Sequence, residues 1–202
     1  GYKKQCIVIR TDQKNESNFE ENDLPLKKEI TMNQKDILQH ISDSGIVGLG
    51  GATFPSHVKL DIRNDNKVDC LVINGVECEP YLTADHRLML EKAEEIIVGI
   101  KILMHALHIK SAVIGIENNK KDAIQVLKQA CADDNSIKVA ALKVKYPQGS
   151  EKQLIKSILK REVPKGGLPM DVGVIVHNVG TIFAIYQAIQ YEIQLMERVV
   201  TI

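Results

Sequence analysis

The sequence predicts an α/β fold in which a mostly parallel sheet is flanked by helices. Short runs of β-branched apolar residues alternate along the chain with longer runs whose apolar residues recur at helical spacing. The short runs are nearly continuous in apolar character, which is typical of strands covered on both faces. Strand and helix in regular turn indicate parallel strands joined by helical crossovers.

The first 32 residues are expected to form a lead-in to this fold. A short strand is predicted at residues 6–10, followed by a polar and acidic linker. From Asn33 the pattern changes, because Asn33 and Asp36 form a helix cap and the apolar residues after them recur at helical spacing. Gly45 ends this predicted helix.

The remaining elements alternate as the fold class requires. Strands are predicted at residues 68–73, 111–116, 137–144 and 173–176. Helices are predicted at residues 86–107, 119–132, 150–159 and 181–189. The helix at 86–107 is expected to tolerate Gly99 at about 1 kcal/mol relative to alanine. Residues 33–190 are therefore the expected α/β domain, and residues 191–202 the start of a following segment.

The composition excludes several classes of function. Of the 202 residues 44% are apolar, and 26 basic residues balance 26 acidic ones. A net charge of zero argues against nucleic acid as a partner. No apolar run approaches the roughly 20 residues of a membrane-spanning helix, so this stretch is expected to be soluble. The four cysteines form no C-x-x-C pair, so free thiols and no metal site are expected.

A glycine-rich stretch, GIVGLGGATFP at residues 45–55, raises the possibility of a nucleotide site. A dinucleotide fingerprint would follow a strand and open a helix, whereas this stretch follows a helix. Thr53 stands where the third glycine belongs, and Phe54 and Pro55 occupy the expected helix start. This context disfavours an ordinary Rossmann dehydrogenase. A Walker A phosphate loop is disfavoured too, because no G-K-[ST] closes the motif.

Three predicted strands end in clusters of polar side chains. These are NGVECEP at residues 74–80, YPQGSE at 146–151 and HNVGT at 177–181. The carboxyl ends of parallel strands meet at one edge of the sheet, where open α/β folds bind ligands. Ser150 and Gln153 form a predicted capping box, whose helix N-terminus is suited to an anion.

These motifs, with GLGGATFPSHVK, PKGGLPMDVGVIVHNVGT and the closing MERVVTI, resemble the family formed by the C subunit of the Rnf electron transport complex. More distantly they resemble the FMN-binding, NADH-oxidising subunit of respiratory complex I. The resemblance covers residues 36–202 and implies a Rossmann-like FMN-binding domain. It implies FMN and NADH as cofactors, with hydride transfer between NADH and FMN and then single electrons to iron–sulfur clusters.

The resemblance also implies roles for individual residues. Gly48, Gly50 and Gly51 would let the backbone approach the flavin, and Lys59 would reach the FMN. Asn74 and Glu77 would contact the flavin, whereas Glu79 would bind the nicotinamide side of NADH; both carboxylates would orient the reactants and transfer no proton. Tyr146 and Glu151 would line the cleft, and Asn178 and Thr181 would serve the ribityl phosphate.

The resemblance extends to partners and to what this chain lacks. Val76, Ser150 and the pair Leu60 and Asp61 depart from the complex I pattern, where an aspartate, a glutamate and aromatic residues are expected. No ferredoxin-like cysteine run follows residue 181, so 4Fe-4S clusters are expected in an absent part of a longer subunit. The implied partners are the other subunits of an Rnf-type complex on the cytoplasmic face of the membrane, NAD(H) and ferredoxin. A cobalamin-reductase-like flavoprotein and a non-catalytic docking module with the same fold remain alternatives.

Overall fold

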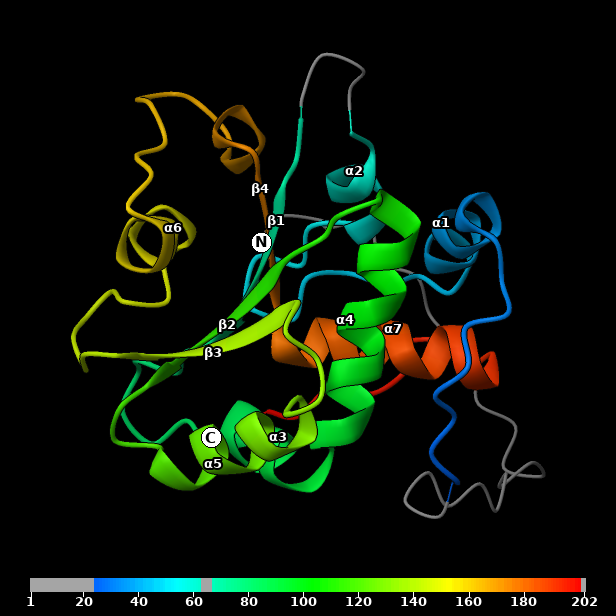
Figure 1. Cartoon of the computed structure of the whole chain (residues 1–202), viewed down its shortest axis with the longest axis horizontal. Helices are drawn as coiled ribbons and strands as arrows, with labels where there is room; N and C mark the ends of the chain where they lie inside the picture. Colours follow the sequence, from blue (N-terminus) through cyan, green and yellow to red (C-terminus); the bar gives the residue numbers. More distant parts are fainter. Residues whose placement is uncertain (1–23, 63–66, 201–202) are drawn as a thin grey trace, which may run out of the picture.

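The computed structural model describes residues 24–62 and 67–200 and contains a four-stranded, all-parallel sheet within them (Figure 1). The strands are β1 (Cys70–Gly75), β2 (Ala112–Glu117), β3 (Ile137–Leu142) and β4 (Val174–Asn178). Their order in the sheet is β3-β2-β1-β4. The predicted fold class is confirmed, whereas the strand predicted at residues 6–10 lies outside the described residues.

Helices connect and cover the strands. They are α1 (Gln34–Asp43), α2 (Ser56–Leu60), α3 (Ala84–Glu91), α4 (Ala93–Leu107), α5 (Lys121–Ala130), α6 (Glu151–Leu159), α7 (Val179–Tyr191) and the 3₁₀ helix η2 (Pro169–Val172). The helices α2 and η2 were not predicted, because four or five residues are too few to show a helical period. None of the helices in the described ranges is both long and apolar enough to cross a membrane.

The single helix predicted at residues 86–107 is wrong, since the structure contains two helices there. Lys92 lies between α3 and α4 with φ −127° and ψ 35°, outside the helical range. Both helices pack against α5 and α7, but the contacts of α3 are mainly with α5 and those of α4 mainly with α7. The residues of α3 and α4 form one continuous apolar pattern, so the sequence does not indicate that the chain changes direction between them.

The two faces of the sheet belong to two apolar clusters. In β1, Leu71 and Ile73 join the larger cluster, which includes α1, α4 and α7. Cys70 and Val72 point to the other face and join a smaller cluster with α6. Figure 1 shows α6 on one side of the sheet and α4 with α7 on the other. The central strands are therefore buried on both faces, as their apolar runs predict.

The edge strand β3 is less buried than its apolar sequence suggests. Ile137 and Leu142 at its two ends are buried, but Lys138 and Ala141 are exposed. The strand pairs only with β2 within the described residues, so its outer side lacks a covering neighbour.

The end of α1 directs the chain into the glycine-rich stretch. Asn33 caps the start of α1 by accepting a hydrogen bond from the Asp36 amide, as predicted. At the other end Gly45 has φ +66°, and the Ile46 amide donates to the Ile41 carbonyl at 3.3 Å. This is the six-to-one bond of a Schellman motif, which ends a helix with a left-handed residue. Gly45 therefore ends the helix, as the sequence predicts.

Candidate functional site

The glycine-rich stretch lies against the N-terminus of α7. The Leu49 amide donates to the Thr181 hydroxyl oxygen at 2.9 Å. A Cβ built on Gly50 would lie 3.5 Å from the Cβ of Asn178, so the two segments are in van der Waals contact. Gly50, Asn178 and Thr181, predicted as site residues from separate motifs, thus lie together at the carboxyl edge of the sheet.

The glycine-rich stretch has free space beside Gly51. Gly51 has φ +119°, a conformation that residues with a side chain rarely adopt, and no atom lies within 4 Å of a Cβ built on it. Gly48 closes the inner side of the loop, where its amide donates to the Phe54 carbonyl at 2.8 Å. Thr53 takes a left-handed conformation with φ +50° in the position of the missing glycine.

Lys59 and Glu151, which come from α2 and from the first turn of α6, form an ion pair. Both were predicted site residues, and the structure brings them together across 92 residues of sequence. Their side chains are 24% and 44% exposed, so the pair borders solvent and a ligand can reach it. The Lys59 ammonium also acts on His177, whose pKa it helps to lower.

Three buried polar atoms near these segments lack a hydrogen-bond partner. They are Ser56 Oγ at the start of α2, Gln148 Oε1 before α6 and His177 Nε2 near the end of β4. Burial, together with the nearby Lys59, lowers the pKa of His177 to about 3, so its imidazole is neutral at physiological pH. Buried polar atoms without partners are uncommon in folded proteins and draw attention to this region.

Asn74, at the carboxyl end of β1, holds a neighbouring loop in place. Its side-chain amide donates to the Gly149 carbonyl at 2.9 Å, and its oxygen accepts from the Val76 amide at 3.1 Å. The predicted flavin contact therefore lies at the junction of two motifs. The capping box predicted for Ser150 is wrong, because Ser150 precedes α6 but its side chain makes no capping hydrogen bond.

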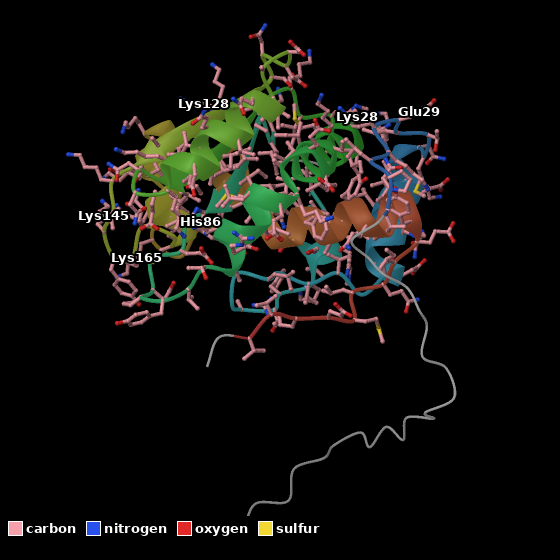
Figure 2. All side chains as sticks on the ribbon, turned by 90° about the horizontal axis from the view of Figure 1, so that it is seen from below. Lys28, Glu29, His86, Lys128, Lys145 and Lys165 are labelled. Carbon is pink, nitrogen blue, oxygen red and sulfur yellow. The ribbon has the colours of Figure 1, made fainter. Side chains whose placement is uncertain are left out.

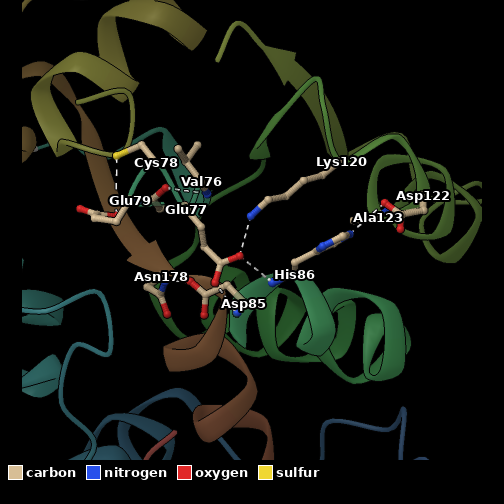
Figure 3. A network of polar contacts seen from close by, with 11 residues as sticks. Val76, Glu77, Cys78, Glu79, Asp85, His86, Lys120, Asp122, Ala123 and Asn178 are labelled. Carbon is tan, nitrogen blue, oxygen red and sulfur yellow. Dashed lines mark hydrogen bonds and ion pairs between the residues drawn. The ribbon is translucent and has the colours of Figure 1, made fainter. Parts of the chain in front are cut away.

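Glu77 is buried and fully engaged within the chain (Figure 3). Its two carboxylate oxygens accept hydrogen bonds from the amides of Asp85 and His86, at 2.8 and 3.1 Å. Lys120 forms an ion pair with Glu77 at 2.5 Å, and the side chains of Lys120 and Glu77 are only 9% and 5% exposed. The carboxylate thus fixes the start of α3 at the edge of the sheet.

Asp85 is a site residue that the sequence analysis missed. Its carboxylate accepts a hydrogen bond of 2.6 Å from the side-chain amide of Asn178 (Figure 3). Burial, with a smaller contribution from the Glu77 charge, raises the pKa of Asp85 to about 6. The signal in the sequence was weak, since an aspartate in the first turn of a helix is common for capping reasons alone.

Glu79 and Tyr146 differ from the other predicted residues in exposure. Tyr146 is 74% exposed, and Glu79 is exposed on the loop after β1. Glu79 accepts only a long 3.8 Å contact from the Cys78 thiol. Figure 2 views the molecule from the side of the strand ends and shows Lys145, the residue before Tyr146 in the sequence, at its periphery. Glu79 and Tyr146 are therefore available to a ligand that covers this edge.

Arg198 is a second residue that the sequence analysis missed. Its guanidinium donates to the Leu49 carbonyl at 2.7 Å, and the Leu195 amide donates to the Ser44 carbonyl at 3.1 Å. The segment after α7, which contains no helix or strand up to residue 200, is thereby tied to the end of α1 and to the glycine-rich stretch.

The arrangement fits a flavin mononucleotide. The open loop at Gly51 suits a flat ring that approaches the backbone, and the N-terminus of α7 with the nearby Lys59 ammonium suits a phosphate. The buried, unpartnered atoms of Ser56, Gln148 and His177 belong to the same segments, where polar groups are incompletely satisfied. The donor set is therefore compatible with the cofactor that the motifs imply.

Comparison with known proteins relates the chain to one family. Residues 41–187 match the family model described as the Nuo51 FMN-binding domain. The C subunit of the proton-translocating ferredoxin:NAD(+) oxidoreductase complex of Clostridium ljungdahlii is 48% identical over 98% of this chain and 43% of its own length. The Na(+)-translocating counterpart of Acetobacterium woodii is 52% identical over 82% and 37%. The C subunit of the ion-translocating oxidoreductase complex of Vibrio cholerae is 45% identical over all of this chain and 26% of its own length.

A solved structure supports the same fold. The air-oxidized NAD+-reducing [NiFe]-hydrogenase superposes with a TM-score of 0.70 and 22% identity, over 79% of this chain and 31% of that chain. At this identity the likeness concerns the fold alone. The chain spans only 26% to 43% of the length of these curated relatives.

Proposed function

The chain belongs to the Nuo51 FMN-binding domain family, and we propose that it binds FMN between the glycine-rich stretch and the N-terminus of α7. The observation that carries this proposal is the hydrogen bond from the Leu49 amide to Thr181, which joins two motifs that lie 132 residues apart. In this proposal the ligand lies at the strand ends against Gly51, where no atom lies within 4 Å of a Cβ built on the residue. Lys59 lies close enough to add a positive charge.

The proposed roles are those that the family resemblance implies, and the contacts of the side chains support them. Asn178 and Thr181 at the start of α7 hold the ribityl phosphate, and Lys59 contacts the FMN once it exchanges part of its pairing with Glu151. The backbone at Gly48, Gly50 and Gly51 lies against the flavin. Asn74 lies at the strand end next to it, and Tyr146 lines the cleft.

The two carboxylates of the loop after β1 take different roles in this proposal. When bound, FMN accepts a hydride from NADH and passes electrons on singly. Glu79, which is exposed, orients the nicotinamide side of NADH by hydrogen bonding. Glu77, which is buried against Lys120, supports the site by fixing the start of α3. Neither carboxylate transfers a proton.

We further propose that the chain is part of a longer subunit of an Rnf-type complex. Its relatives carry names of ferredoxin:NAD(+) oxidoreductase complex subunits, which supports NAD(H), ferredoxin and the other subunits as partners. These names favour the Rnf-type assignment over a cobalamin-reductase-like flavoprotein. The 4Fe-4S clusters that would receive the electrons belong to the rest of the subunit, peripheral on the cytoplasmic face of the membrane.

The proposal is tested by the flavin content of the purified chain and by titration with FMN. Quenching of flavin fluorescence at stoichiometric FMN, followed by bleaching of the flavin absorbance when NADH is added anaerobically, is the expected result. A chain that binds no FMN under these conditions would contradict the proposal and favour a docking module. A chain that binds FMN but is not bleached by NADH would retain the flavin site and lose the proposed reaction.

A further inference from the structure

The side chain of Asn178 has two partners that fix its orientation. Its oxygen accepts a hydrogen bond from the Gly180 amide at 2.8 Å and so caps α7. Its amide nitrogen donates to an Asp85 carboxylate oxygen at 2.6 Å. A carboxylate can only accept hydrogen bonds, whereas an amide has a donating and an accepting end. The charged Asp85 therefore determines which end of the Asn178 amide faces α7.

Asp85 is itself held in place without help from a ligand. Its backbone amide donates to Glu77 at 2.8 Å, and Glu77 is fixed in turn by its ion pair with Lys120. Figure 3 shows Asp85 at the start of α3, between Glu77 and Asn178. The contacts thus run from Lys120 through Glu77 and Asp85 to the first turn of α7.

We propose that Asp85 is a positioning residue that sets the orientation of the Asn178 side chain and thereby the affinity of the α7 N-terminus for the FMN phosphate. This inference rests on the proposed function for its ligand, but the orientation of Asn178 does not. With the amide reversed, its nitrogen would face the Gly180 N–H, and the cap of α7 would be lost. A helix start without its cap frays and no longer aligns its amides toward an anion.

The orientation of the Asn178 side chain by Asp85 is expected to depend on pH, because charged groups surround Asp85. Glu77 faces it from the loop after β1, Lys120 from the turn before α5 and Arg198 from the segment after α7, while Asn178 faces it from the end of β4. Because burial raises the pKa of Asp85 to about 6, the carboxyl group becomes neutral in mildly acidic solution. The neutral acid can donate as well as accept, so it no longer selects one orientation of the amide.

The first test compares FMN affinities of the wild type, Asp85→Asn and the control Asp122→Asn. Asp122 is an exposed carboxylate that pairs with His86 on the outer side of α3. At about pH 8, Asp85→Asn is expected to raise the Kd for FMN roughly tenfold, the cost of one charge-assisted hydrogen bond. The control is expected to leave the Kd unchanged. A Kd of Asp85→Asn equal to or below that of the wild type would overturn the proposal, since removing a negative charge near a phosphate should by itself tighten binding.

The pH dependence separates the positioning role from a structural one. The FMN phosphate also titrates near pH 6, so the informative quantity is the ratio of the two Kd values at each pH. The ratio is expected to fall toward one below about pH 5, where wild-type Asp85 is neutral as well. A ratio that stays constant across this range would show that the substitution acts through the fold alone and would overturn the proposal.

A measurement on the ligand-free protein distinguishes failure of this inference from failure of the proposed function. The side-chain amide signals of Asn178, assigned in ¹⁵N-labelled protein by comparison with Asn178→Ser, are expected to shift with pH with a midpoint near that of Asp85. Absence of such a shift would refute the orienting role, even if Asp85→Asn fails to fold. A clear shift in a protein that binds no FMN would support the orienting role and contradict only the proposed function.

Discussion

At the scale of single residues, Glu77 and Glu79 show how two carboxylates of one motif acquire different roles. They lie two positions apart on the loop after β1, and the family resemblance implies that both contact a ligand directly. The structure buries Glu77 between Lys120 and the first turn of α3 and leaves Glu79 exposed. The difference comes from Lys120, which pairs with Glu77 from a position 43 residues away in the sequence. No local sequence pattern predicts this pairing.

Replacing each carboxylate by its amide tests this difference. Glu77→Gln removes the carboxylate that pairs with the buried Lys120 ammonium and is expected to lower the free energy of unfolding by about 3 kcal/mol, measured by urea denaturation. Glu79→Gln is expected to leave the urea midpoint unchanged and to slow the bleaching of bound FMN by NADH. Loss of FMN from Glu79→Gln would mean that the roles of the two carboxylates are reversed.

The ion pair of Lys59 with Glu151 gives a second prediction at this scale. Lys59→Ala is expected to raise the Kd for FMN at least tenfold, because a charged hydrogen bond contributes about 1.5 to 3 kcal/mol. Its effect on the free energy of unfolding should stay below about 1 kcal/mol, since the pair is partly exposed.

Lys156→Ala is the matched control for Lys59→Ala, measured by the same fluorescence titration. It breaks an exposed ion pair with Glu162 at the opposite end of α6 and should not change FMN binding. If the two substitutions changed the Kd for FMN equally, Lys59 would not contact the FMN.

At the scale of elements, the sequence predicts what is local and misses what depends on a neighbour. The four strands and the caps at Asn33 and Gly45 follow from the order of apolar, polar and glycine residues. The break at Lys92 does not, because α3 and α4 carry one continuous apolar pattern and differ only in how much of their packing is against α5 and how much against α7. The capping box predicted at Ser150 was wrong for a related reason. The sequence pattern permits a capping hydrogen bond from the Ser150 side chain, but the folded loop does not make it.

Gly99 shows an element-scale constraint that helix propensity alone gets wrong. Gly99→Ala should gain about 1 kcal/mol of helix propensity. However, the new Cβ would lie 2.5 Å from the Ile182 carbonyl oxygen in α7, so α4 and α7 must move apart. Overpacking of this kind costs about 1 to 3 kcal/mol, and here the close atom belongs to the backbone and cannot rotate away.

We therefore expect Gly99→Ala to lower the free energy of unfolding, measured from urea denaturation. Gln125→Ala, at an exposed position of α5, is the control and should change it by less than about 0.5 kcal/mol. A more stable Gly99→Ala protein would show that the two helices have room to separate.

At the scale of the whole molecule, the motifs and the fold agree on one edge of the sheet. The parallel arrangement predicted from the alternating pattern brings Asn74, Glu151, Asn178 and the glycine-rich stretch to the strand ends, and the family match confirms the resemblance seen in the motifs. What the sequence could not supply are the contacts between distant segments, namely those of Asp85 with Asn178 and of Arg198 with Leu49. Such contacts depend on how the segments pack and produce no periodic pattern in the sequence.

The buried His177 and the partly buried Asp85 make the stability of the ligand-free molecule depend on pH in opposite directions. His177 has a pKa lowered from 6.5 to about 3, so the stability present above pH 6.5 is progressively lost as the pH falls toward that value. Asp85 has a pKa raised from 3.8 to about 6, so its contribution is complete below pH 3.8 and lost as the pH rises through about 6. The two contributions therefore oppose each other as the pH falls below about 6.

The variant His177→Asn should therefore be less sensitive to acid than the wild type. As the pH falls from about 6.5 to 4, the urea midpoint of the wild type is expected to decrease relative to that of His177→Asn. All other titrating groups are common to both proteins, so the difference between the two curves isolates the imidazole. Parallel curves would mean that His177 is solvated well enough to be protonated in the folded protein, and the buried, unpartnered Nε2 atom would then have to be reached by water.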